Sequence, residues 1–260
     1  MSLLEVRDLS KAFDGVIAAS GVSFSVAAGT LVALIGPNGA GKSTIFNMVG
    51  GQLPSDGGKV LLEGQLLTGL PPRAIWRKGV GRTFQIAQTF VSMSVAENVQ
   101  MALMSAHGRT RRLWPSARRL YRKEALTILA DLGMREQAER AVSQLAYGDV
   151  KRVELAIALA SAPKLLLMDE PAAGMAPAER GVLMNLVARL ARERRIGVLF
   201  TEHDMDAVFA HASRVLVLVR GEIVSRGTPE EVRADPIVQR AYLGEGNLIR
   251  RQTREASVHA

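Results

Sequence analysis

The sequence contains no cysteine, so disulfide bonds and thiolate metal sites are excluded. This absence is compatible with a reducing compartment without proving one. No apolar run approaches the roughly 18 residues that a membrane-spanning helix needs. The start of the chain, Met1 to Glu5, lacks the basic residues and the long apolar stretch of a signal peptide. Together these absences predict a cytoplasmic protein.

What the chain does contain is a large apolar fraction and an excess of positive charge. With 260 residues, of which 48% are apolar, it is long enough for one large domain or one domain with an inserted lobe. The net charge is +8. Nucleic acid, an anionic membrane surface, a phosphate ligand or simply a solvated surface could explain this charge. The basic residues cluster at Arg109, Arg111, Arg112, Arg118, Arg119, Arg122 and Lys123, and again at Arg250 and Arg251.

Strand and helix signals alternate in the first third of the chain. Residues 3–9 and 22–26 alternate apolar with polar side chains, which indicates half-buried strands, and Leu31 to Ile35 reads as a strand buried on both faces. A helix is expected over 43–49. Residues 60–67 read as a hairpin around Gly64, and Pro71-Pro72 opens a short helix.

Residues 86–150 differ in character, because strand signals disappear. Ser94 and Glu97 have the spacing of a capping box, so a helix should follow through Leu103. A basic loop is expected over 106–118, and two further helices near 119–132 and 134–142. This segment predicts a helical insertion.

Strand–helix alternation returns from Lys164. Strands are expected at 165–168, 198–200 and 215–219, followed by a hairpin at Gly221 and a helix capped by Thr228. A helix over 178–194 places an apolar row on one face, formed by Val182, Leu183, Leu186, Val187 and Leu190. The predicted fold is therefore α/β with a mostly parallel sheet, antiparallel strands near the start and an inserted helical subdomain. We expect one domain over 1–244, with a core of 1–85 and 151–244 and a helical subdomain of 86–150, and a polar tail over 245–260.

A glycine-rich loop follows the strand that ends at Ile35. Its residues are Gly36, Pro37, Asn38, Gly39, Ala40, Gly41, Lys42 and Ser43, which match the phosphate-binding loop pattern. The glycines let backbone N–H groups turn inward around a β-phosphate, and the following helix adds its positive N-terminus. We expect Lys42 to neutralise β- and γ-oxygens, Ser43 to bind Mg²⁺ and Thr44 to reach the α-phosphate. The ligand implied is a nucleoside triphosphate with magnesium.

Two acids follow the apolar run that ends at Met168. A buried strand delivers Asp169 and Glu170 to the carboxyl edge of the sheet, where open α/β sheets bind ligands. Asp169 is expected to hold Mg²⁺ through water, and Glu170 to be the general base that orients the attacking water. We also expect the strands ending at Ile35 and Met168 to be neighbours, so that Lys42 and Glu170 face the same terminal phosphate.

These motifs, in this order, resemble those of the ABC ATPases from about residue 3 to 244. The resemblance implies a fold with a P-loop NTPase core, binding of ATP and Mg²⁺, and ATP hydrolysis. It implies that Gln85, in Thr83-Phe84-Gln85, touches Mg²⁺ and the attacking water, and that His203 hydrogen-bonds the γ-phosphate and holds the water and Glu170 in geometry. Phe13 matches the aromatic residue that stacks on adenine; the alternative is a core phenylalanine.

The resemblance also places a signature sequence at residues 145–149. The helix that follows would point at the γ-phosphate held by a second cassette. The residues involved are Ala146, Tyr147, Gly148 and Asp149. Ala146 lacks the usual serine hydroxyl and Tyr147 replaces a glycine, while Gly148 keeps the close backbone approach and a helix dipole from about Val150 remains. Ala176 stands where an aspartate is usual in the D-loop, which puts that cross-dimer contact in doubt.

The variant spellings of these motifs resemble the ATPase subunits of branched-chain amino acid importers, more closely the longer of the two. The partners implied are a second ABC ATPase subunit, two transmembrane permease subunits and, indirectly, a solute-binding protein, with no nucleic acid. The chain would then be peripheral on the inner face of the membrane. Ile86, Phe90, Val91 and Met93 either line a groove for a cytoplasmic helix of the permease or form the core of the helical lobe.

Three other functions stay open. Similar cassettes serve urea import and lipid export. A soluble ABC ATPase acting on nucleic acid or ribosomes would account for the positive charge. A regulatory module that does not turn over would account for the altered signature and D-loop, although Glu170 and His203 argue against it.

Overall fold

The computed structural model describes residues 2–83, 89–108 and 120–240. Its main sheet has the strand order β10-β9-β3-β8-β7-β6. Five of these strands are parallel, namely β3 (Leu31–Ile35), β6 (Val80–Thr83), β7 (Leu165–Asp169), β8 (Gly197–Thr201) and β9 (Arg214–Val219), and β10 (Glu222–Gly227) pairs antiparallel with β9. A second, antiparallel sheet has the order β2-β1-β4-β5. It comprises β1 (Ser2–Phe13), β2 (Val16–Ala27), β4 (Gly57–Leu62) and β5 (Gln65–Leu66), which confirms the predicted fold class.

The two faces of the main sheet belong to different cores, because alternate residues of a strand point to opposite sides. Val32 and Leu34 of β3 pack with α1 (Lys42–Val49) and the antiparallel sheet. Ala33 and Ile35 pack on the other face, beneath α6 (Pro177–Arg194) and the helical lobe. All five residues of β3 are buried, as its continuous apolar run predicts.

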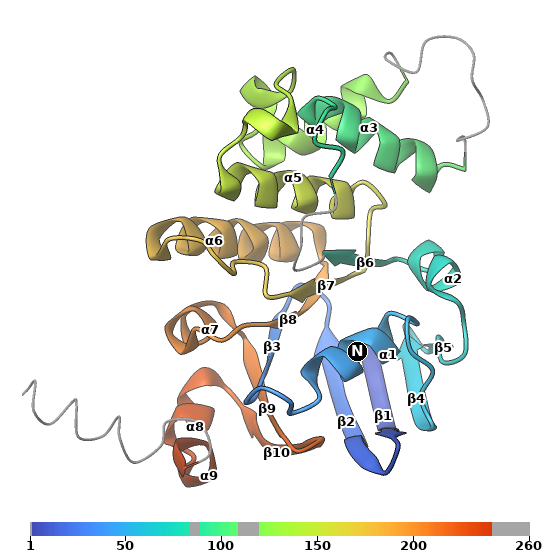
Figure 1. The fold of residues 1–260 in the computed structure, drawn as a ribbon, viewed down its shortest axis with the longest axis vertical. Helices are drawn as coiled ribbons and strands as arrows, with labels where there is room; N and C mark the ends of the chain where they lie inside the picture. Colours follow the sequence, from blue (N-terminus) through green and yellow to red (C-terminus); the bar gives the residue numbers. More distant parts are fainter. Residues whose placement is uncertain (1, 84–88, 109–119, 241–260) are drawn as a thin grey trace, which may run out of the picture.

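The helical lobe lies at one end of the molecule, next to α6 (Figure 1). It contains α3 (Val95–Ala106), α4 (Arg122–Asp131) and α5 (Tyr147–Leu159). The predicted capping box of Ser94 and Glu97 is present at the start of α3. The predicted helix near 134–142 is wrong: that segment forms only two short 3-10 turns, Arg135–Gln137 and Val142–Gln144. The carbonyls of Ala138 and Arg140 accept N–H groups from the first turn of α3, so they do not serve a helix of their own.

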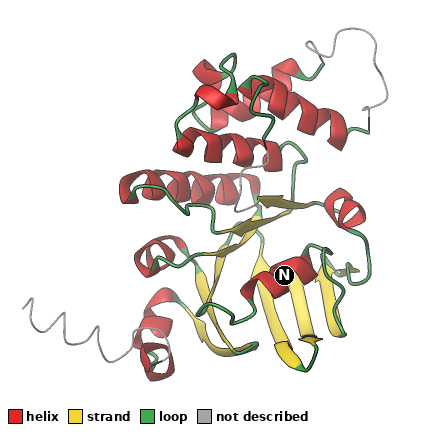
Figure 2. Ribbon diagram, viewed as in Figure 1, coloured by secondary structure: helices red, strands yellow, loops and turns green. Residues whose placement is uncertain are grey.

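The remaining helices of the described residues are short. They are α2 (Pro72–Arg77), α7 (Met205–His211), α8 (Pro229–Ala234) and α9 (Pro236–Val238). In Figure 2 the helical lobe stands apart from the strands, with α6 between the lobe and the main sheet. Thr228 and Glu231 form the predicted capping box of α8. On α6 the predicted apolar row is buried or partly buried except for Val182, which is 52% exposed. The polar tail lies outside the described residues, as does most of the basic loop.

The strand order corrects one expectation that bears on the site. β3 and β7 are not neighbours, because β8 pairs with both and lies between them. The carboxyl ends of all three parallel strands still meet at one edge of the sheet. Residues that follow β3, β7 and β8 are therefore brought together there.

Candidate active site

The glycine-rich loop connects β3 to α1 at the carboxyl edge of the sheet. A Cβ at Gly36 would lie 2.2 Å from the Leu218 carbonyl oxygen, and one at Gly41 would lie 2.1 Å from the Ala18 carbonyl oxygen. Glycine is required at both positions because the backbones of β9 and β2 approach so closely. Gly39 has a φ of +78° and no atom within 4 Å of its Cβ position, so the loop is open at that point.

Lys42 lies inside this loop and is nearly buried. Its Nζ donates hydrogen bonds to the carbonyl oxygens of Gly36, at 2.7 Å, and Pro37, at 3.0 Å. Burial lowers the pKa of Lys42, and the negative charges of Glu170 and Asp169 partly oppose that shift. Because the carboxyl ends of β3, β8 and β7 meet at one edge of the sheet, the loop and the acidic strand end lie at the same edge. Ser43 and Thr44 follow in the first turn of α1.

The two acids are held by Thr201, a buried residue at the end of β8. The Thr201 hydroxyl donates to Asp169 Oδ1 at 2.7 Å and accepts from the Glu170 N–H at 3.0 Å. Glu170 has a φ of +47°, so the chain turns sharply directly after the strand. Sequence reasoning missed Thr201, although a hydroxyl at the end of a buried strand was an available signal.

His203 follows the same strand end and reaches the second acid. Its Nε2 lies 2.6 Å from Glu170 Oε1. The sequence placed both residues at the carboxyl edge, and the structure brings them into contact. A histidine bonded to a carboxylate can hold that carboxylate in a fixed orientation and exchange a proton with it.

A buried glutamate, Glu202, fixes the backbone on both sides of the contact between His203 and Glu170. Its carboxylate accepts the N–H groups of Ala172 and His203, both at 3.2 Å. Burial raises the pKa of Glu202, and these hydrogen bonds partly oppose the shift. Glu202 thereby ties the segment after β7 to the segment after β8. This role could not be predicted from the sequence, because an acid next to a candidate histidine matches no motif that separates a structural from a functional acid.

Arg82 on β6 is a third residue whose role could not be predicted from the sequence. Its Nη2 lies 3.8 Å from Asp169 Oδ2, while its Nη1 donates to Asn47 Oδ1 and to Gln52 Oε1, each at 2.9 Å. Burial lowers the pKa of Arg82, and Asp169 partly opposes that shift. Asp169 therefore has a fixed partner on each oxygen, Thr201 on one and Arg82 on the other.

The predicted signature residues lie at the start of α5, which begins at Tyr147 and not near Val150. Ala146 is the residue before the helix, and Asp149 lies 3.6 Å from Arg152. Tyr147 Oη donates to the Ala173 carbonyl oxygen at 3.2 Å, which anchors the first turn and accounts for the earlier start. Within the described part of the chain, none of the four signature residues forms a hydrogen bond or ion pair with the phosphate loop.

Aromatic and apolar candidates are placed at the surface. Phe13 is 43% exposed at the end of β1, with Lys11 Nζ 5.4 Å from its ring centroid, so it is not a core residue. Phe90 and Val91 are 55% and 60% exposed. The alternative in which these two side chains form the core of the lobe is therefore wrong. Gln85 and Ile86 lie outside the described residues.

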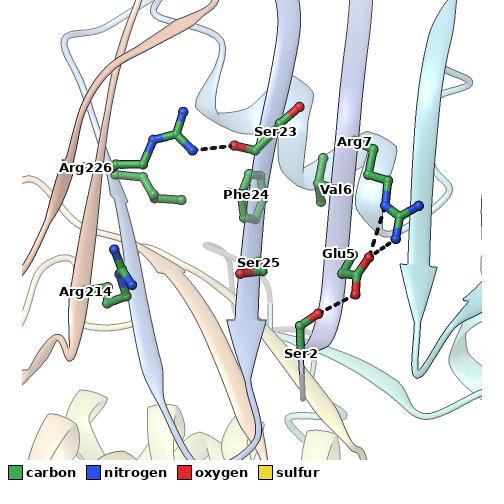
Figure 3. Close-up of a pocket in the computed structure, with 10 residues that line it drawn as sticks. Ser2, Glu5, Val6, Arg7, Ser23, Phe24, Ser25, Arg214 and Arg226 are labelled. Atoms are coloured by element: carbon green, nitrogen blue, oxygen red, sulfur yellow. Dashed lines mark hydrogen bonds and ion pairs between the residues drawn. The ribbon is translucent and has the colours of Figure 1, made fainter.

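In the described part of the chain, two of the grooves that border strands lie away from Lys42 and Glu170. One, of about 400 Å³, runs along the antiparallel sheet, with Arg214 and Arg226 on one side and Glu5 and Arg7 on the other (Figure 3). The other, of about 450 Å³, lies between the core and the lobe. Its walls come from α2, β6, α3 and α5. We call it the interlobe groove; its lining includes Arg73, Trp76, Arg77, Arg82, Ser105 and Ile157.

The donor set at the sheet edge fits magnesium bound together with a phosphate ligand. In residues 2–83, 89–108 and 120–240, no group of three or more His, Asp or Glu side chains could hold a metal ion alone. The Ser43 hydroxyl and the Asp169 carboxylate are hard oxygen donors, and Mg²⁺ commonly takes one or two such ligands while phosphate oxygens and water complete its shell. No helix in the same described ranges is long and apolar enough to cross a membrane.

A phosphate loop, an acidic strand end and a histidine at one sheet edge define a P-loop ATPase. The family model described as ABC transporter matches residues 19–173, and one described as branched-chain amino acid ATP-binding cassette transporter matches residues 222–246. The chain belongs to the ABC transporter ATPases.

Individual proteins of this family are similar to the chain over most of its length. The chain is 41% identical over 254 residues to the high-affinity branched-chain amino acid transport ATP-binding protein LivG of Escherichia coli K12, covering 94% of this chain and 98% of LivG. It is 39% identical over 251 residues to BraF of Pseudomonas aeruginosa, which carries the same description, with the same coverage. A solved ADP conformation of MJ1267, an ATP-binding cassette of an ABC transporter, matches with a TM-score of 0.84 and 33% identity, covering 94% of this chain and 100% of that one.

Proposed function

We propose that this chain is the ATP-hydrolysing subunit of an ABC importer for branched-chain or other hydrophobic amino acids. The observation that carries the hydrolytic part is the position of Glu170, which contacts His203 and acts electrostatically on Lys42. The names of the relatives LivG and BraF support the solute class, as does the family match at residues 222–246.

In this proposal the phosphate loop binds the triphosphate of ATP. Lys42 leaves the Gly36 and Pro37 carbonyls for β- and γ-phosphate oxygens, and Thr44 reaches the α-phosphate. Ser43 would hold Mg²⁺ directly, and Asp169 would hold it through water. The metal supplies charge neutralisation at the phosphates. The remaining contacts of the loop with the triphosphate come from Pro37, Asn38, Gly39, Ala40 and Gly41.

Glu170 then orients a water for attack on the γ-phosphate. His203 keeps the Glu170 carboxylate in place and hydrogen-bonds the same phosphate group, and Gln85 contacts the metal and the water. Phe13 stacks on adenine, for which its exposure at the end of β1 leaves it available. Positioning and charge stabilisation account for most of the rate in phosphoryl transfer, so fixed side chains are the contribution that this site makes.

The proposed assembly contains a second cassette and two permeases, and indirectly a solute-binding protein. The second cassette presents residues Ala146 to Asp149 to the γ-phosphate, where the positive N-terminus of α5 and the backbone of Gly148 contribute. The permeases bind the core and lobe, so the chain is peripheral on the inner face of the membrane. The unit that moves is the helical subdomain, expected over 86–150 from the sequence and extended here to Leu159 because α5 runs unbroken from Tyr147 to Leu159. It moves against the core formed by the other described residues.

Glu170→Gln tests the hydrolytic part. The variant should bind ATP with Mg²⁺ as the wild type does, while phosphate release falls by about 10²- to 10⁴-fold because the base is lost. Glu124→Gln, an exposed acid on α4, is the matched control and should retain turnover. Turnover of Glu170→Gln within a few-fold of the wild type would reject Glu170 as the base.

Uptake assays test the solute. The chain would be assembled with the permeases and binding protein of its gene neighbourhood, and uptake of radiolabelled leucine compared with that of urea. Leucine uptake that is lost with Glu170→Gln supports the proposal. Lipid export is the second candidate, since the lipopolysaccharide export protein LptB of Haemophilus influenzae is 35% identical over 245 residues. A neighbourhood without a solute-binding protein, and no leucine uptake, would favour export.

A further inference from the structure

Arg82 lies between the acidic strand end and the interlobe groove. On one side its guanidinium is 3.8 Å from Asp169, the acid proposed to hold magnesium. On the other side Arg82 is part of the wall of the interlobe groove. Its side chain is only 12% exposed, so any group that enters the groove beside it meets a cation that has little water around it.

The guanidinium is held in place by neutral oxygen atoms. Asn47 on α1 and Gln52 just after α1 both accept hydrogen bonds from Nη1. These contacts hold Nη1, and Nη2 lies 3.8 Å from Asp169 Oδ2. Arg82 therefore supplies a positive charge to the oxygen of Asp169 that Thr201 does not contact.

The lining of the interlobe groove is positively charged, which favours an occupant that carries negative charge. Among the described residues, its lining contains three arginines, Arg73, Arg77 and Arg82, and no aspartate or glutamate. Apolar side chains, including Ile75, Trp76 and Ile157, form the rest of its walls. This combination fits a segment that has apolar side chains and at least one carboxylate, which a permease segment would supply.

We propose that Arg82 is a positioning residue that links occupation of the interlobe groove to magnesium binding at Asp169. This inference rests on the proposed function. Arg82 acts as the resident counter-ion of Asp169 and competes with Mg²⁺ for that carboxylate. A carboxylate of a permease segment in the groove draws the guanidinium away from Asp169, and the Mg²⁺–nucleotide complex then binds more tightly. By linkage, bound magnesium strengthens the docking of the permease to the same extent.

The test is the Mg²⁺ concentration that half-saturates binding of a fluorescent ATP analogue to the full chain. Arg82→Met removes the positive charge that competes with Mg²⁺ for Asp169. The half-saturating Mg²⁺ concentration should therefore fall by about three- to tenfold, because Mg²⁺ is no longer repelled by a nearby cation in a partly buried site. A purely structural role for Arg82 predicts the opposite sign, since a disordered Asp169 would bind Mg²⁺ more weakly. Arg82→Gln, which keeps a hydrogen-bonding group, gives the same test if the methionine variant does not fold.

Two comparisons make the test specific. Arg77→Met removes a charge from the same groove without the contact to Asp169, so it should leave the Mg²⁺ requirement unchanged; an equal change would overturn the proposal. In the assembled transporter the wild type should need less Mg²⁺ than the isolated chain, whereas Arg82→Met should show no such difference. An unchanged or increased Mg²⁺ requirement in Arg82→Met overturns the inference alone. A wild-type chain that binds no magnesium nucleotide would overturn the proposed function as well.

Discussion

His203 Nε2 and Glu170 Oε1 lie 2.6 Å apart, although the two residues come from the ends of different strands, β8 and β7. Glu202 fixes the His203 backbone N–H, and Thr201 fixes that of Glu170. The contact is thus set by backbone hydrogen bonds on both sides. This preorganisation means that the carboxylate needs little rearrangement before it orients a water.

Removing the histidine should therefore impair turnover more than binding. In His203→Ala we expect phosphate release to fall by about 10²-fold, because Glu170 loses the group that orients it. ATP affinity should change by only a few-fold, since the phosphate loop and Lys42 are untouched. Phosphate release and equilibrium nucleotide binding are the two measurements. His107→Ala, in the helical lobe, is the control and should behave as the wild type; equal turnover in both variants would remove His203 from the mechanism.

The exposed ring of Phe13 gives a prediction about affinity. If it stacks on adenine, Phe13→Ala should weaken ATP binding by about tenfold or more, as alanine substitution of base-stacking aromatics does. Folding stability should change little, because the side chain is not part of the core. Val16→Ala, at an exposed position paired with Phe13 in the hairpin, is the matched control. Equal affinities in the two variants, measured by titration calorimetry, would exclude stacking.

Motifs that are contiguous in sequence were predicted well, whereas contacts set by strand order were not. The phosphate loop and Asp169-Glu170 each follow one apolar strand, so local pattern was sufficient to place them at the sheet edge. Thr201 and Arg82 contact Asp169 only because β8 and β6 flank β7. No local signal encodes this order, which is also why β3 and β7 were wrongly expected to be neighbours.

Errors in the helical lobe have a similar cause. Buried Met134, Ala138 and Val142 have helical spacing, yet backbone pairing with the start of α3 takes the carbonyls that a helix would use. The start of α5 was placed too late because the bond from Tyr147 to Ala173 is a tertiary contact. In both cases a long-range hydrogen bond decided between two conformations that the local sequence allows.

Glu202 gives a prediction about pH and stability. Burial raises its pKa, so the folded chain keeps a proton at pH values where the unfolded chain has lost it. The unfolded state then binds fewer protons, and the contribution of Glu202 to the unfolding free energy falls as pH rises from about 4.3 to the raised pKa. Above the raised pKa the contribution is constant.

Glu202→Gln removes this titration. The unfolding free energy of the wild type, taken relative to that of the variant, should decrease with pH across that window and then level off. Chemical denaturation at a series of pH values measures the difference. A difference between wild type and Glu202→Gln that rises with pH would contradict a raised pKa.

A substitution at Gly148 can test the proposed contact between two cassettes without disturbing the fold of a single chain. A Cβ at this position would lie 3.4 Å from Met175 Cε and 3.7 Å from the Glu179 carboxylate, which are ordinary contacts, so alanine fits a single chain. Replacing a helical glycine with alanine should leave stability unchanged or raise it by up to about 1 kcal/mol. In the proposed closed pair, however, the added methyl group would stand between the backbone of α5 and the γ-phosphate of the partner.

We therefore expect Gly148→Ala to keep its melting temperature and its affinity for ATP while turnover falls by about tenfold or more, since the lost approach to the phosphate removes hydrogen bonds to a charged group. Combined with Glu170→Gln, it should also fail to form the ATP-dependent dimer in size-exclusion chromatography. Gly181→Ala, on α6 with no atom within 4 Å of its Cβ position, makes the same chemical change away from the proposed contact and should retain turnover. Full activity and normal dimers in Gly148→Ala would mean that the signature helix does not approach the partner's phosphate at this residue.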